Sequence, residues 1–195
     1  MHRLCASLIK LRRYKDVIYV AGRALELDPA SALAHNNQGM ALQALDRLAE
    51  AEKAYRGALE LAPDYPRALG NLGVVLQSTG RKEEAEASYR RAIEIKPEYT
   101  QALDNLAALI QELGRAEEAE EMYGRILAIS PDHAEAHNDL GNLLQDQGRL
   151  EEALVSYRRT VEIAPKHRLA YNNMALAQQD QGKLAEALAS LDRQV

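Results

Sequence analysis

The chain has 195 residues, of which 47% are hydrophobic and 27% charged, and its formal net charge is −5 at pH 7. It has no Phe and no Trp, so Tyr supplies all nine aromatic residues. A single cysteine, Cys5, excludes an intramolecular disulfide framework and any multi-cysteine metal site. The remaining composition is rich in helix formers and fits a reducing compartment, so we expect a helical, cytoplasmic protein.

The first segment, residues 1–31, carries six Lys or Arg residues against three acidic ones, whereas the rest of the chain is acidic. Such a segment could contact a membrane or RNA, but the solvated end of a helix is the simpler interpretation. No apolar run reaches the ~18 residues of a membrane span, and no secretory signal sequence follows Met1. We therefore expect neither a membrane nor a nucleic-acid partner.

A repeat of 34 residues organises the whole chain. Five of the six prolines recur at this spacing, at Pro29, Pro63, Pro97, Pro131 and Pro165. A fixed period of this length is typical of stacked helical units. With the proline at position 32, a divergent partial unit (1–31) precedes whole units at 32–65, 66–99, 100–133 and 134–167 and a truncated unit at 168–195. We expect one solenoid over 1–195, without a linker.

Each unit is expected to form two amphipathic helices, A and B. In helix A, apolar or small residues fall at positions 3, 4, 7, 8, 10 and 11, which form one stripe at helical spacing. Helix B carries Ala at position 20 and Tyr at position 24, and it ends before the proline. Gly at position 15 predicts a left-handed cap after helix A. The residues there are Asp46, Gly80, Gly114, Gly148 and Gly182.

Small residues at positions 8 and 20 should let the two helices approach closely, with the position 24 Tyr filling the space beside them. The tyrosines are Tyr55, Tyr89, Tyr123 and Tyr157. Basic residues at position 16 and Glu at position 19 predict i,i+3 ion pairs on a solvated face. Such exposed pairs contribute little to stability, so we do not expect a site there.

Residues 66–99 resemble a tetratricopeptide repeat, with Leu72, Gly73, Leu76, Ala85, Tyr89, Ala92 and Pro97 at the family's pattern positions. The resemblance recurs in every unit. It implies an all-α fold, a right-handed α-solenoid of stacked antiparallel helix-turn-helix repeats that binds proteins or peptides on a concave surface lined by the A helices. The chain departs from the family pattern at position 4, which is aromatic only at Tyr171, and at Leu191, which replaces the position 24 Tyr.

Asparagine is concentrated on one face of helix A. All eight asparagines lie at position 5, 6 or 9, although Asn is a mediocre residue for a helix interior. Position 6 carries Asn37, Asn71, Asn105, Asp139 and Asn173, and the remaining asparagines are Asn36, Asn138, Asn142 and Asn172. Glutamine forms a second row at position 12, which includes Gln77, Gln111 and Gln145.

A side-chain amide has an acceptor and two donors, so it can pair with both polar groups of one peptide unit. We predict that these Asn, Asp and Gln residues form a ladder that binds an extended peptide by its backbone. The alternative is that the amides bond neighbouring helices and stabilise the stacking of repeats. Asp139 interrupts the row and could favour a basic or N–H-rich segment of a ligand.

The ladder resembles the asparagine-rich concave surface of the tetratricopeptide domain in O-linked N-acetylglucosamine transferases. By that resemblance, peptide-backbone binding carries over to Asn37, Asn71, Asn105 and Asn173. The basic clamp with which chaperone-adaptor members of the family hold a C-terminal carboxylate does not appear, because position 5 has no basic residue. Binding of a chaperone's acidic tail is therefore not expected.

Catalytic signatures are missing from the sequence: there is no nucleophile triad, phosphate-binding loop or dinucleotide fingerprint. We expect Cys5 to be a small buried hydrophobe rather than a nucleophile. His133 and His137 are four residues apart, but only Glu135 nearby could add a third ligand. We predict a protein that is not an enzyme, with no metal and no cofactor.

Both ends of the sequence fall inside a repeat without a polar capping helix. We therefore expect a segment of a longer protein, whose uncapped ends favour homo-oligomers. Three functions stay open: a non-catalytic module that binds an extended peptide or protein segment, a substrate-recruiting arm of an O-GlcNAc-transferase-like glycosyltransferase, and a scaffold that self-associates through its end faces.

Overall fold

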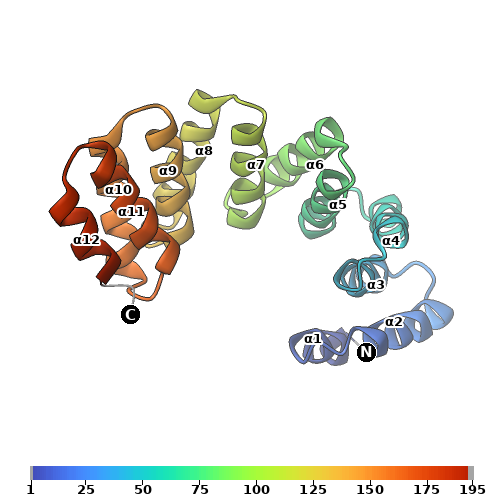
Figure 1. Ribbon diagram of the computed structural model, residues 1–195. Coiled ribbons are helices and arrows are strands. Elements are labelled where there is room, and N and C mark those ends of the chain that lie inside the picture. Colours follow the sequence, from blue (N-terminus) through green and yellow to red (C-terminus); the bar gives the residue numbers. More distant parts are fainter. Residues whose placement is uncertain (1, 193–195) are drawn as a thin grey trace. The chain divides into compact units, whose positions relative to one another are not determined.

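The computed structural model of this 195-residue chain describes residues 2–192, with side chains from residue 4 onward. Within this range it contains helices and no strands (Figure 1). The helices are α1 (His2–Lys10), α2 (Tyr14–Leu27), α3 (Ala32–Ala44), α4 (Leu48–Leu61), α5 (Pro66–Ser78), α6 (Lys82–Ile95), α7 (Thr100–Glu112), α8 (Ala116–Ile129), α9 (Ala134–Asp146), α10 (Leu150–Ile163), α11 (Arg168–Asp180) and α12 (Leu184–Asp192). From α3 to α11, each odd-numbered helix begins at position 1 of its repeat, as the proline spacing predicts.

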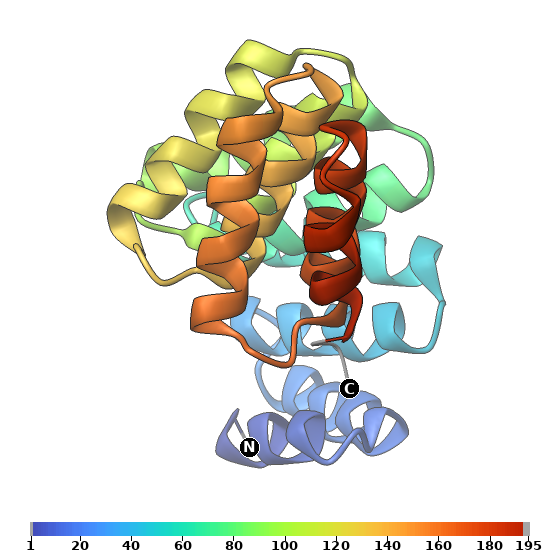
Figure 2. The same ribbon diagram turned by 60° about the vertical axis from the view of Figure 1, so that its left-hand side comes forward.

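The chain divides into two compact units, residues 1–105 and 106–195, with the boundary inside α7. In the first unit α1 pairs with α2, α3 with α4 and α5 with α6, and α2 and α4 also pack on the hairpin that follows each of them. The second unit repeats this arrangement with α9 paired to α10 and α11 to α12 (Figure 2). The predicted all-α architecture of stacked helical hairpins is confirmed, whereas one continuous solenoid across the boundary stays a prediction.

Successive A helices also contact each other directly, α3 with α5 in the first unit and α9 with α11 in the second. These contacts bring residues of the same repeat position side by side on neighbouring helices. The A-helix side of each unit is therefore the place where residues from different repeats can act together.

The predicted left-handed caps are present after every whole A helix. Gly80, Gly114, Gly148 and Gly182 have φ between 74° and 79°, and Asp46 adopts the same region with φ 59°. Arg12, at the corresponding place of the first hairpin, does so as well, with φ 54°. After the cap, the Arg81 N–H donates back to the Leu76 carbonyl over 2.9 Å, which closes the end of α5.

In three hairpins the tyrosine at position 24 packs against a glycine at position 8. Tyr89 is fully buried, and a Cβ atom on Gly73 would lie 2.7 Å from its Cδ1. The same relationship joins Gly39 to Tyr55 and Gly141 to Tyr157. A bulky residue at position 8 would overpack this contact at a cost of about 1–3 kcal/mol.

Ion pairs cover the B-helix side. The predicted i,i+3 pairs are confirmed at Arg47–Glu50, Arg81–Glu84, Arg115–Glu118 and Arg149–Glu152. Arg81 also donates to Glu52 of the preceding repeat over 2.8 Å, and Arg149 reaches Glu120 over 2.6 Å. Burial raises the pKa of Glu52, but hydrogen bonds from Arg81 and Arg56 outweigh it and leave this pKa lowered. These arginines therefore link successive B helices as well as their own.

Candidate functional site

The A-helix face carries all the asparagines that the repeat pattern singles out. They lie on α3 (Asn36, Asn37), α5 (Asn71), α7 (Asn105), α9 (Asn138, Asn142, beside Asp139) and α11 (Asn172, Asn173). Asn36, Asn37 and Asn138 are buried, with 0%, 6% and 7% of their surface exposed. The others, Asp139 included, are half-buried. The individual amides of this face therefore differ in their access to solvent.

Hydrogen bonds between asparagines connect neighbouring A helices. In the first unit, Asn71 Nδ2 donates to Asn36 Oδ1 over 3.1 Å. In the second unit, Asn173 Nδ2 donates to Asn138 Oδ1 over 3.2 Å and to Asn142 Oδ1 over 2.8 Å. The bonds to Asn36 and Asn138 join position 6 of one repeat to position 5 of the repeat before it, and the bond to Asn142 joins position 6 to position 9. The position 5 asparagines thus serve the stacking of repeats, which is the alternative role considered for them.

The position 6 amides keep part of their hydrogen-bonding capacity. Asn71 uses one N–H, so its second N–H and its Oδ1 have no partner among the described residues. Asn37 and Asn105 make no side-chain hydrogen bond within the part of the chain that the structure describes. Asn173 Nδ2 donates to two acceptors, and Asn173 Oδ1 has no partner among the described residues. The capacity to hold a ligand therefore resides mainly in position 6.

The glutamines at position 12 accept hydrogen bonds from the buried tyrosines. The Tyr hydroxyl to Gln Oε1 distances are 2.7 Å for Tyr55 and Gln43, 3.1 Å for Tyr89 and Gln77, 3.0 Å for Tyr123 and Gln111, and 2.9 Å for Tyr157 and Gln145. This pairing was not foreseen, although Tyr and Gln occur together in the same four repeats. In the last hairpin, where Leu191 replaces Tyr, Ser190 donates instead to Gln178 over 2.8 Å.

Asp139 brings an acidic group into the amide row. It accepts a hydrogen bond from Asn138 Nδ2 over 3.1 Å. Burial raises its pKa, and the hydrogen bond from Asn138 only partly offsets that effect. Helix α9 also carries Glu135 and Asp146. The A-helix face of the second unit is thus acidic along α9.

The histidines considered as metal ligands have other partners. His133 Nδ1 accepts a hydrogen bond from the Ala136 backbone N–H over 3.2 Å and so caps α9. His137 Nε2 lies 2.9 Å from the Pro131 carbonyl oxygen, to which it donates in the Nε2–H tautomer. Over the described residues, no three His, Cys, Asp or Glu side chains are grouped for a metal ion. Cys5 is 2% exposed in the core, as predicted, and burial raises the pKa of its thiol.

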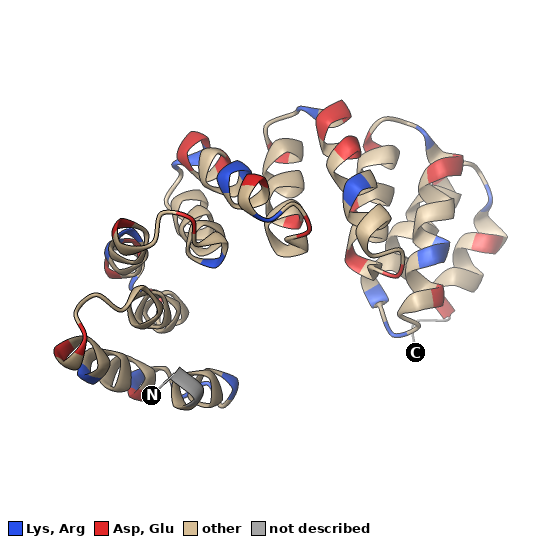
Figure 3. Ribbon diagram, turned by 180° about the vertical axis from the view of Figure 1, so that it is seen from behind, with Lys and Arg blue, Asp and Glu red and all other residues tan. Residues whose placement is uncertain are grey.

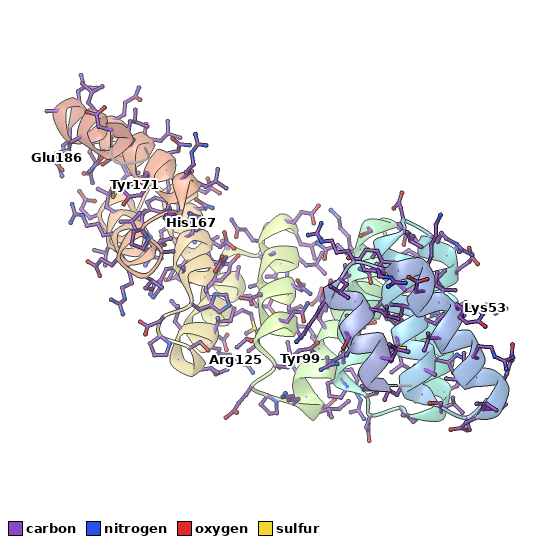
Figure 4. The ribbon with its side chains drawn as sticks, turned by 90° about the horizontal axis from the view of Figure 1, so that it is seen from below. Lys53, Tyr99, Arg125, His167, Tyr171 and Glu186 are labelled. Carbon is purple, nitrogen blue, oxygen red and sulfur yellow. The ribbon has the colours of Figure 1, made fainter. Side chains whose placement is uncertain are left out.

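A hollow of the first unit lies away from the asparagines, along α4 and beside α3. It encloses about 880 Å³, and Lys53, labelled in Figure 4, is one of its lining residues. Glu50 pairs with Arg47 and Glu52 with Arg81, whereas Glu60 and Lys53 form no ion pair among the described residues. This groove carries charges of both signs and none of the asparagines that the repeat pattern singles out, so the A-helix face remains the candidate site.

The architecture and the repeat pattern together define a class, the helical-repeat proteins that present one row of helices as a binding surface. The chain belongs to the tetratricopeptide repeat family. The family's models match residues 30–98, 99–166 and 169–193, which is most of the sequence. Tetratricopeptide repeat proteins are protein-interaction modules. No curated protein matches the chain.

Solved structures with the same fold share little sequence with the chain. YrrB, described as a TPR protein with an unusual peptide-binding site, is 24% identical with a TM-score of 0.72, covering 89% of this chain and 90% of its own. The pilF protein of Pseudomonas aeruginosa is 21% identical with a TM-score of 0.86, and the match covers 98% of this chain and 89% of the pilF chain. MamA is 22% identical with a TM-score of 0.74, and the match covers 80% of this chain and 91% of the MamA chain. These likenesses establish the fold.

No helix in residues 2–192 is long and apolar enough to cross a membrane. The resemblance of the amide row to the glycosyltransferase arm stays a prediction, as does the cytoplasmic location.

Proposed function

We propose that the chain binds an extended peptide segment on the A-helix face and holds the peptide by its backbone. Each unit has its own residues for this function, Asn37, Asn71 and Asn105 in the first unit and Asn173 in the second. Peptide binding suits the tetratricopeptide family, and YrrB, with the same fold, is described as having a peptide-binding site. The side-chain amides of these asparagines specify how the peptide would be held.

The main support comes from the amide of Asn71. Its bond to Asn36 holds the side chain in one orientation while leaving an acceptor and one N–H for a ligand. An amide fixed in advance loses less conformational freedom when a peptide binds, so the stacking bond strengthens the binding role. In this account position 5 orients the amides and position 6 contacts the peptide.

Asn105 offers a clean test because it makes no side-chain hydrogen bond among the described residues. A tight-binding peptide would first be selected from a displayed library of unstructured peptides. Its affinity would then be measured by fluorescence anisotropy for wild type, Asn105→Ala and Lys53→Ala, a control on α4. We expect Asn105→Ala to weaken binding about tenfold, or ~1.4 kcal/mol. The thermal unfolding temperature should stay unchanged.

Unchanged affinity in Asn105→Ala and in the double variant Asn71→Ala with Asn105→Ala, with both proteins folded, would refute the proposal. Circular dichroism supplies the folding control, since Asn71→Ala also removes the bond to Asn36. Loss of binding in Lys53→Ala would place the peptide along α4 instead.

A second candidate function is self-association through the terminal hairpin. Helix α12 exposes Leu184 and Leu188, at 63% and 65%, on one face at i,i+4 spacing. Exposed apolar faces of this kind favour contacts between copies. Sedimentation of wild type and Leu188→Glu tests it: concentration-dependent association that the variant abolishes is expected, and a strict monomer at high concentration excludes it.

A further inference from the structure

A second hollow in the first unit lies at the beginning of helices α3 and α5 and just before α7. It has a volume of about 300 Å³ and is lined by Leu33, Tyr65, Pro66, Arg67, Lys96 and Tyr99. Arg67 precedes Asn71 by four residues on α5, so the two side chains lie on the same side of that helix. This tyrosine pocket therefore adjoins the amide row on the A-helix face.

The two tyrosines occupy positions where other repeats have helix caps. Ser31 and His167 precede α3 and α11, and each accepts a hydrogen bond from a backbone N–H of the first turn. Tyr65 precedes α5 and makes no such bond. Losing a cap typically costs about 1 kcal/mol. Tyr65 is half-buried at the pocket instead. Its side chain therefore lines the pocket and does not cap the N-terminus of α5.

A glycine makes room for the second ring. Gly70 lies at position 5 of its repeat, where α3, α9 and α11 have asparagine. A Cβ atom there would lie 3.3 Å from Cε1 of Tyr99, which is labelled in Figure 4. The Nζ atom of Lys96 lies 5.6 Å from the centre of the Tyr99 ring, at cation–π distance. Ring and cation are thus packed as one wall of the pocket.

Both cations of the pocket lack an acidic partner. In the described part of the chain, Arg67 and Lys96 form no ion pair, whereas Arg47, Arg81 and Arg91 are each paired with a carboxylate. Burial raises the pKa values of Tyr65 and Tyr99, and the charge of Arg67 acts in the opposite direction on both. Arg67 lines the same hollow as both tyrosines, and the Tyr99 hydroxyl donates to Gln101 Oε1 over 3.5 Å, which leaves the Tyr65 hydroxyl as the donor for a ligand.

The charge around the pocket suits an anion. Helix α3 has no charged residue, as its uniformly tan ribbon shows in Figure 3, and the single charge on α5 is that of Arg67. Residues 1–105 carry 15 basic and 14 acidic residues, whereas residues 106–195 carry 9 and 15. At the position of Arg67, helix α9 of the second unit has Glu135. The tyrosine pocket is thus a feature of the first unit.

We propose that the tyrosine pocket binds an anionic group, a carboxylate or a phosphoryl group, of the peptide. Arg67 and Lys96 supply the positive charge, the Tyr65 hydroxyl donates a hydrogen bond, and Leu33 and Pro66 contact the apolar stem of the anionic residue. The peptide part of this inference rests on the proposed function, but binding of a small anion does not. The first unit therefore selects extended peptides with an acidic or phosphorylated residue.

The test is a titration of ¹⁵N-labelled full-length protein followed by amide NMR shifts. The probes are N-acetylglutamate α-amide, N-acetylglycine, N-acetylphosphotyrosine amide and, as a neutral control, N-acetylglutamine α-amide. We expect saturable shifts at the Gly70 and Tyr99 amides with at least one anionic probe and none with the glutamine probe. The probe that binds tightest identifies the anion as a side-chain carboxylate, a chain terminus or a phosphoryl group.

Two variants decide whether the pocket is responsible. Arg67→Gln should weaken anion binding by about tenfold. Arg168→Gln is the control, because it removes an exposed arginine from the first turn of another A helix, α11, one repeat position before that of Arg67. Equal shifts with the neutral probe, or equal binding by Arg67→Gln and wild type, would overturn the proposal.

Asn105→Ala separates this proposal from the proposed function. It should weaken peptide binding while leaving the binding of the small anion unchanged. Anion binding together with peptide affinity unaffected by Asn105→Ala and by the double variant Asn71→Ala with Asn105→Ala would refute the amide ladder and support the pocket. Loss of peptide binding in Asn105→Ala without any anion binding would refute the pocket alone.

Discussion

Asn71 donates a hydrogen bond from its side-chain nitrogen to the side-chain oxygen of Asn36, which lies 35 residues earlier in the chain. The donor sits on α5 and the acceptor on α3, so the bond crosses between two A helices. The same relationship, again over 35 residues, joins Asn173 to Asn138 in the second unit. The amides of this protein thus connect successive repeats before any ligand is considered.

Removing the acceptor of this bond should destabilise the protein. Asn36 is fully buried, and Asn36→Ala leaves an Asn71 N–H without its partner, so we expect a loss of about 1–2 kcal/mol in the free energy of unfolding. A double-mutant cycle with Asn71→Ala, measured by urea denaturation, should give a coupling energy of roughly 1 kcal/mol. Additive effects of the two substitutions would show that the bond contributes nothing.

A single substitution after the C-terminal end of α3 should stabilise the folded protein. Asp46 has a left-handed backbone, with φ 59°, at the position where the other whole repeats have glycine. Asp46→Gly should raise the free energy of unfolding by about 0.5–1 kcal/mol, because glycine adopts this conformation without steric cost. Gly80→Ala, with φ 79°, is the opposite change and should lower it by a similar amount. A stabilising Gly80→Ala would contradict this account of the caps.

Buried tyrosines should make the protein sensitive to alkali. Burial raises the pKa values of Tyr55, Tyr89 and Tyr157, so the folded state keeps these protons at a pH where the unfolded chain loses them. Stability is therefore full below the unfolded pKa of about 10 and falls as the pH rises above it. Urea midpoints measured from neutral pH upward should decline beyond about pH 10. The urea midpoint of Tyr55→Phe should fall less steeply with pH than that of the wild type. Equal slopes in the two proteins would contradict a contribution of the buried Tyr55 to this pH dependence.

The sequence was sufficient to predict the repeat, the helix boundaries and the Gly and Tyr contact, because each recurs at a period that only stacked hairpins satisfy. The i,i+3 pairs followed from helix geometry alone. The bonds from Arg81 to Glu52 and from Asn71 to Asn36 did not, since both depend on how one repeat is placed on the next. That placement is set by packing between helices and not by the pattern within a repeat.

The candidate site was predictable as a face but not as a set of separate roles. The spacing put every asparagine on helix A, yet it could not distinguish Asn36, buried and engaged, from Asn105, half-buried and without a side-chain partner among the described residues. The tyrosine pocket was missed because its residues come from helix ends. Gly70, in a position that other repeats give to asparagine, was the available signal.

The central claim is that the A-helix face recognises a peptide backbone. The most direct measurement is an N-methylation scan of a selected peptide, in which each backbone N–H is blocked in turn and the affinity is compared with alanine substitution of the side chain. The account predicts about a tenfold loss at the amides held by the asparagines, with little effect of most side-chain truncations. An affinity that follows the side chains and tolerates N-methylation throughout would contradict it.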